Sequence, residues 1–175
     1  MPSSDGKSIG GENNHYFSIN IGPIHLVSFS TEFYYFLEYG FKQVKTQYEW
    51  LERDLKEANR PENRELRPWI VTMAHRPMYC SNADNDDCTK FDDRVRAGFP
   101  FVKTFGLEGL FYKYGVDLEL WAHEHSYERL WPIYNYQVFN GSEEEPYTNP
   151  GAPVHIGKHK IRWAIFCRKN LNNFL

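Results

Sequence analysis

Three histidines follow two apolar runs of the chain and could together hold a metal ion. His75 comes shortly after the run at 69–73, and His123 and His125 follow directly on the run at 116–121. If the chain leaves the second run extended, alternate side chains share one face, so His123 and His125 would point to one place and Glu124 away from it. Three neutral imidazoles suit a borderline metal such as zinc or iron. Spacing alone does not decide between a metal site and ordinary surface histidines.

Buried strands are expected to position these histidines. The runs at 69–73 and 116–121 read as strands of a sheet covered on both faces, and ligand sites gather outside the carboxyl ends of such strands. Alternating patterns predict strands at 16–20 and 25–30, and apolar residues three and four apart predict a helix at 38–58. A second helix is expected at 107–114, and short strands at 133–139 and 153–156. The sequence therefore predicts an α/β fold.

Size and charge narrow the class of protein. The chain has 175 residues and a net charge of −3, which favours one domain without a basic surface for nucleic acid or a polybasic stretch for anionic membranes. No apolar run approaches the roughly 20 residues of a membrane helix. The first residues are polar and lack the pattern of a signal peptide, which taken alone indicates the cytosol. No feature predicts an oligomeric state.

Two other features favour an oxidising compartment. Cys80 and Cys88 lie eight residues apart in a polar loop, where they could form a disulfide or remain two unrelated thiols. A zinc pair is disfavoured because Cys-x-x-Cys spacing is lacking. Asn140 begins an Asn-Gly-Ser sequon, a candidate glycosylation site, and Cys167 is the odd cysteine.

Two blocks of the sequence resemble a known family. The segment at 71–79 is similar to the fourth signature block of purple acid phosphatases, and the segment at 122–129 to the fifth, with a His-x-His followed by an aromatic residue, Glu and Arg. Similarity runs from about residue 16 to 156 and is greatest to the animal iron/zinc members. The resemblance implies an αββα metallophosphoesterase fold, a β-sandwich flanked by helices, of which this chain is the C-terminal half.

The resemblance also assigns roles to residues. It implies that His75 and His123 bind the divalent metal (zinc, iron or manganese) and that His125 binds the ferric ion. The activity implied is hydrolysis of phosphate monoesters at acidic pH, in a secreted or lysosomal parent protein. We expect Arg76, Glu128 and Arg129 to orient the ligand side chains without binding the metal. For Glu128 and Arg129, a simple ion pair with each other is an equal alternative.

Departures from the family limit this expectation. Ala122 replaces the usual Gly, the acidic residues at 84–87 stand where many plant members have substrate-binding histidines, and the three earlier metal-ligand blocks are missing. The domain organisation expected is a loop at 1–15, a partial catalytic domain at 16–156 and a divergent tail at 157–175. We expect a truncated or spliced product that is inactive alone, the alternative being a non-enzymatic binding or decoy protein.

Overall fold

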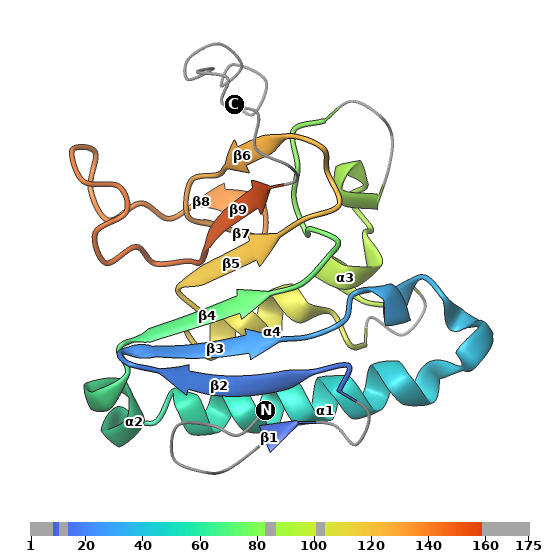
Figure 1. Ribbon diagram of the computed structural model, residues 1–175. Coiled ribbons are helices and arrows are strands. Elements are labelled where there is room, and N and C mark those ends of the chain that lie inside the picture. The colour runs from blue at the N-terminus through green and yellow to red at the C-terminus, as the bar shows by residue number, and fades with distance from the viewer. Residues whose placement is uncertain (1–8, 11–13, 83–86, 101–103, 159–175) are drawn as a thin grey trace.

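A seven-stranded mixed sheet with helices on one face forms the centre of the molecule (Figure 1). The computed structural model describes residues 9–10, 14–82, 87–100 and 104–158. The strands of this sheet are β1 (Ile9–Gly10), β2 (Phe17–Ile21), β3 (Ile24–Ser28), β4 (Trp69–Met73), β5 (Leu118–Trp121), β6 (Tyr127–Arg129) and β9 (Val154–Lys158). A separate two-stranded hairpin is formed by β7 (Ile133–Tyr134) and β8 (Gln137–Val138).

The order of the strands brings four carboxyl ends to one edge of the sheet. The order is β1-β2-β3-β4-β5-β9-β6, in which β3, β4, β5 and β9 run parallel. Strands β2 and β6 run antiparallel to them, and β1 pairs antiparallel with β2. Gly22, at φ 53°, makes the tight turn between β2 and β3. The segments that follow β4 and β5 therefore leave the sheet side by side.

Helices cover one face of the sheet. They are α1 (Phe41–Ala58), α2 (Pro61–Leu66), α3 (Arg94–Ala97) and α4 (Leu107–Lys113), with 3-10 turns η1 (Glu32–Tyr34), η2 (Leu37–Tyr39) and η3 (Asp87–Thr89). The apolar stripe of α1 is fully buried at Val44, Leu51 and Leu55. Polar contacts also fasten α1 to the sheet: Asp54 accepts a hydrogen bond from Ser18 Oγ at 2.6 Å and lies 2.9 Å from His25 Nε2.

The opposite face of the sheet is apolar and is not covered by any helix of the described residues (Figure 1). Paired strands place Ile19 beside Leu26, Leu26 beside Val71, and Val71 beside Leu118. Because side chains alternate along a strand, this row points away from the side on which Asp54 contacts the sheet. Ile21, Trp69 and Met73 share this open face and are 52%, 54% and 40% exposed.

The elements agree with the expected α/β class, and their differences have local causes. The long helix begins at Phe41 rather than 38, because Gly40 at φ 83° separates it from η2. The segment at 78–100, which includes the polar loop of Cys80 and Cys88, contains α3 and η3 and buries Met78 and Val95. Strand β1 lies in the segment expected as loop, and β9 continues to Lys158, past the boundary expected at 156. Residues 159–175, which include Cys167, and the acidic residues at 84–86 lie outside the described part of the chain.

Candidate metal centre

His75 and His123 meet at the carboxyl edge of the sheet. They follow β4 and β5, which are parallel neighbours, and the hydrogen bond from Ala122 N to the carbonyl oxygen of His75 joins the two exits at 2.9 Å. His123 Nδ1 lies 3.1 Å from His75 Nε2, with the ring planes nearly perpendicular at 81°. His75 is exposed and His123 is half-buried. The structure thus brings together two of the three histidines singled out by their spacing.

This separation fits two ligands of one metal ion. Imidazole nitrogens bind zinc at about 2.0–2.1 Å, so two of them at an angle of about 100° lie about 3.1 Å apart. Without an ion, the same distance is an ordinary hydrogen bond in which one ring donates to the other. The donor set therefore suits a borderline divalent metal.

The turn after β5 differs from the expected extended chain. Strand β5 ends at Trp121, and His123 has φ 63°, the left-handed region that few residues other than Gly adopt. Alternation of side chains therefore stops before the His-x-His segment. Glu124 does not point away: it is 7% exposed, and its carboxylate lies within 4.8 Å of ligand atoms of His123 and Asp87. The expectation for Glu124 was wrong because it assumed a continuous strand.

Arg76 links His123 to two carboxylates. Its Nη1 donates to Asp87 Oδ2 at 2.7 Å and lies 3.4 Å from His123 Nε2, while its Nε donates to Glu32 Oε1 at 3.0 Å. The guanidinium also lies over the Tyr35 ring, 4.5 Å from its centroid. Glu32 and Tyr35 from the η1 segment and Asp87 from η3 thus hold Arg76 in one position beside the imidazole.

The other residues expected near the metal lie further along the same segment. His125 is exposed, two residues beyond His123. Glu128 accepts a hydrogen bond from the backbone N–H of Ser81 at 3.1 Å, whereas the Arg129 guanidinium lies 4.7 Å from the centroid of the Tyr147 ring. Glu128 and Arg129 are successive residues of β6, so they point to opposite faces of the sheet.

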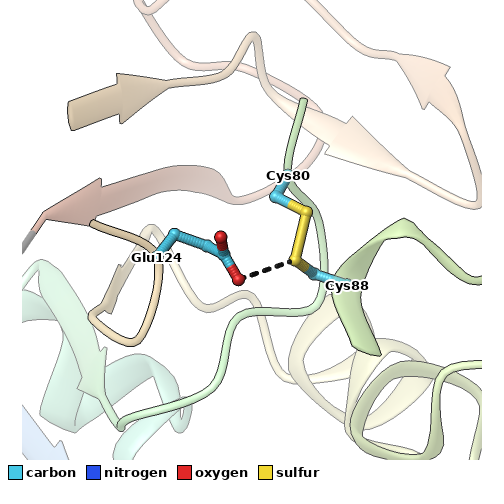
Figure 2. Close-up of side chains that lie close together, drawn as sticks. All are labelled: Cys80, Cys88 and Glu124. Carbon is cyan, nitrogen blue, oxygen red and sulfur yellow. Dashed lines mark hydrogen bonds between the residues drawn. A yellow bond between two sulfur atoms is a disulfide. The ribbon is translucent and has the colours of Figure 1, made fainter. Parts of the chain in front are cut away.

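A disulfide closes the loop that carries Asp87. Cys80 and Cys88 are bonded, with Cα atoms 5.5 Å apart, and Figure 2 shows Glu124 directed at this bond. Asn82 Nδ2 donates to Glu124 Oε2, which holds the loop against the turn after β5. Asn140 of the sequon is exposed in the loop after β8.

Asp87 and Glu124 were missed by the sequence argument. Asp87 is 4% exposed, and with His123 and Glu124 it forms a group of ligand atoms that all lie within 4.8 Å of one another. Asp87 belongs to a run of acidic residues that reads as solvated surface. A signal was nevertheless present, since the adjacent Cys88 can anchor such a loop to a core.

The chain belongs to the calcineurin-like phosphoesterase family, because residues 2–127 match the sequence model of that family. Among curated proteins, it is 65% identical over 169 residues to acid phosphatase type 7 of Mus musculus and 60% identical over 168 residues to that of Homo sapiens. These alignments cover 96% and 95% of this chain but 37% of each relative. The chain therefore spans little more than a third of the length of these relatives.

The fold is that of a purple acid phosphatase. The structure matches a purple acid phosphatase from yellow lupin (Lupinus luteus) seeds with a TM-score of 0.61 and 24% identity, over 84% of this chain and 23% of that chain. The expected α/β fold of this family and the expected family are confirmed, with a sheet that contains both parallel and antiparallel strands. No helix in the described ranges is both long and apolar enough to span a bilayer.

Proposed function

We propose that this chain supplies one side of a binuclear metal site that hydrolyses phosphate monoesters, as in an acid phosphatase. The observation that carries the proposal is the approach of His75 and His123 to 3.1 Å at the ends of two parallel strands. Membership of the calcineurin-like phosphoesterase family and the names of the animal relatives support the reaction class.

In this proposal His75 and His123 hold a divalent ion (zinc, iron or manganese), and His125 holds the ferric ion. Bound ions of this kind lower the pKa of a coordinated water and stabilise negative charge on phosphoryl oxygens. Arg76 binds Asp87 at Oδ2, and this oxygen lies 3.9 Å from His123 Nε2, the ring nitrogen that would carry the proton when Nδ1 holds the metal. Glu128 acts more remotely, by fixing the loop at Ser81.

Among the residues that the structure describes, the proposed site is incomplete. Three imidazoles, even with the carboxylates of Asp87 and Glu124, do not supply the bridging ligand and second set that two ions require. The apolar face of the sheet supports the same conclusion, since an αββα fold needs a second sheet against it. We therefore propose that the isolated chain has little or no phosphatase activity.

A non-enzymatic role is the alternative. The pair His75 and His123 can hold one ion without turnover, which would make the chain a metal-binding or decoy product. Metal content together with hydrolysis of an aryl phosphate, measured on one sample, separates the two roles.

The experiment compares the chain with its His123→Ala variant, using His15→Ala as a control at an exposed histidine. We expect the chain and the control to bind zinc, the His123→Ala variant to bind it at least about tenfold more weakly, and none to hydrolyse aryl phosphate. Metal-dependent hydrolysis that His123→Ala abolishes would show that the isolated chain is active. Equal zinc affinity in all three proteins would instead show that His123 is not part of a metal site.

We also propose that the parent protein is secreted or lysosomal and carries a glycan at Asn140. The exposed sequon and the disulfide between Cys80 and Cys88 support this compartment. A mass decrease after glycosidase treatment of protein made in animal cells, absent in Asn140→Gln, tests the glycan.

A further inference from the structure

Three side chains around the disulfide form a second group with the chemistry of a metal site. Sulfur atoms of Cys80 and Cys88 and a carboxylate oxygen of Glu124 all lie within 4.8 Å of one another (Figure 2). Glu124 Oε1 is 3.3 Å from Cys88 Sγ. Glu124 is 7% exposed and Cys88 4%, so the carboxylate and the sulfur are held in a fixed, largely dry environment.

The oxidised form of this group is a poor ligand set. A disulfide sulfur carries neither a proton nor a negative charge, whereas a thiolate is a strong ligand for zinc. Two thiolates and one carboxylate would leave one position of a tetrahedral zinc ion. Glu124 shares its neighbourhood with His123 and Asp87, either of which could fill that position, as could water.

We propose that reduction of the Cys80–Cys88 disulfide creates a Zn²⁺ site from Cys80, Cys88 and Glu124. Cys80 is half-buried and Cys88 buried, so a dithiol reductant reaches the Cys80 sulfur first. One thiolate of the reductant forms a mixed disulfide with Cys80 and releases Cys88 as a thiolate. The second thiol of the reductant then attacks this mixed disulfide and releases Cys80. Two electrons pass from the dithiol, which becomes a disulfide, and zinc binding displaces the remaining protons of the cysteines.

This site does not depend on the proposed phosphatase function. Its three defining ligands, Cys80, Cys88 and Glu124, do not include His75 or His123, although His123 is one of the groups that could fill the fourth position. Sequence spacing disfavoured a zinc pair because it lacks Cys-x-x-Cys, but the fold adds a carboxylate 36 residues after Cys88. The apposition of the loop and the turn after β5 therefore supplies what local spacing does not.

The test uses Co²⁺ as a spectroscopic probe for zinc in the full chain carrying Cys167→Ser, so that two cysteines remain. After reduction by a phosphine, which supplies no competing thiol, we expect a thiolate–Co²⁺ charge-transfer band that one equivalent of Zn²⁺ removes. The oxidised chain should show no such band. Glu124→Gln should weaken Zn²⁺ binding by about tenfold or more, and Cys80→Ser should abolish the band.

His75→Ala provides the matched control, because it removes an imidazole of the other site and should leave the band unchanged. Absence of the band in the reduced chain overturns the proposal. Equal Zn²⁺ affinity of the reduced chain and of its reduced Glu124→Gln variant overturns the proposal as well. The same holds where circular dichroism shows that reduction unfolds the chain, because zinc then binds flexible thiolates without Glu124.

Discussion

At the scale of single residues, a buried pair joins β5, the strand that leads to the candidate metal centre, to its neighbour β9. His155 and Glu119 are 2% and 1% exposed, and His155 Nδ1 lies 3.3 Å from Glu119 Oε2. Trp121 Nε1 donates to the same His155 nitrogen at 3.2 Å. Burial lowers the pKa of His155 to about 3 and raises the pKa of Glu119 well above its usual value. Both side chains are therefore neutral at mildly acidic pH.

This burial makes the stability of the chain depend on acidity. An unfolded histidine binds a proton below about pH 6.5, while native His155 does not until about pH 3, so the contribution of His155 is lost as the pH falls between these values. Relative to His155→Gln, the chain should lose about 2 kcal/mol of unfolding free energy between pH 6.5 and 5. Urea unfolding at both values measures this difference. The exposed His15→Gln should follow the unsubstituted chain, and a parallel pH profile in His155→Gln would contradict the assignment.

Which residues of the candidate site could be predicted depends on where regular structure stops. His75 and His123 were found because buried strands point their carboxyl ends at one edge, a property of the whole sheet. Glu124 could not be placed, because the left-handed residue before it ends the alternation on which its direction was argued. Asp87 depends on a loop whose path is fixed by a disulfide and by Arg76.

At the scale of elements, α1 fixes the segment on which Arg76 rests. Gln47 of α1 is fully buried, accepts a hydrogen bond from Ser30 N at 2.9 Å and donates to Ser30 O at 2.8 Å. The next residue, Thr31, accepts from the backbone N–H of Arg76 at 2.8 Å, and Glu32 accepts from its side chain. A helix far from the histidines thus determines where the exit of β3 meets Arg76.

Gln47→Leu should destabilise the chain by about 2 kcal/mol, because it leaves two backbone groups of Ser30 without these partners. Chemical denaturation followed by far-ultraviolet circular dichroism measures the loss. Glu49→Ala on the exposed side of the same helix is the control, with an expected change within about 0.5 kcal/mol. Similar stabilities of the two variants would show that the Ser30 contacts contribute little.

Long periodic elements could be predicted, and short ones could not. Strand β4 lies where its apolar run predicts, and α1 ends at Ala58 as expected before Asn59 and Pro61. Strand β6 has three residues with no run of its own and exists because β9 offers it a partner. Such a strand is decided by pairing between distant segments, which local periodicity does not contain.

At the scale of the whole molecule, helices cover one face of the sheet, and no helix of the described residues covers the other face. The apolar row crosses four neighbouring strands, and exposed apolar side chains beside it favour association. The most exposed of these side chains are Ile21, Trp69 and Met73. The isolated chain is therefore expected to be less soluble than its net charge of −3 suggests.

We expect the chain to self-associate at rising concentration and the double variant Trp69→Lys, Met73→Lys to do so less, because two charges interrupt the apolar row. Sedimentation velocity over a concentration series measures this. Phe91→Lys removes a 74% exposed aromatic outside the sheet and should leave association unchanged. A chain that is monomeric at every concentration would contradict the expectation.

The position of β9 has a consequence for the order in which the molecule is assembled. Strand β9 lies between β5 and β6, although both precede it in the chain. During synthesis the turn with His123 emerges before the strand that separates its two flanking strands, so β6 has no place in the sheet until residues 154–158 have been made. The segment between His123 and β6 can therefore take its final path only after residues 154–158 have been made, whereas the pairing of β4 with β5 does not wait for them.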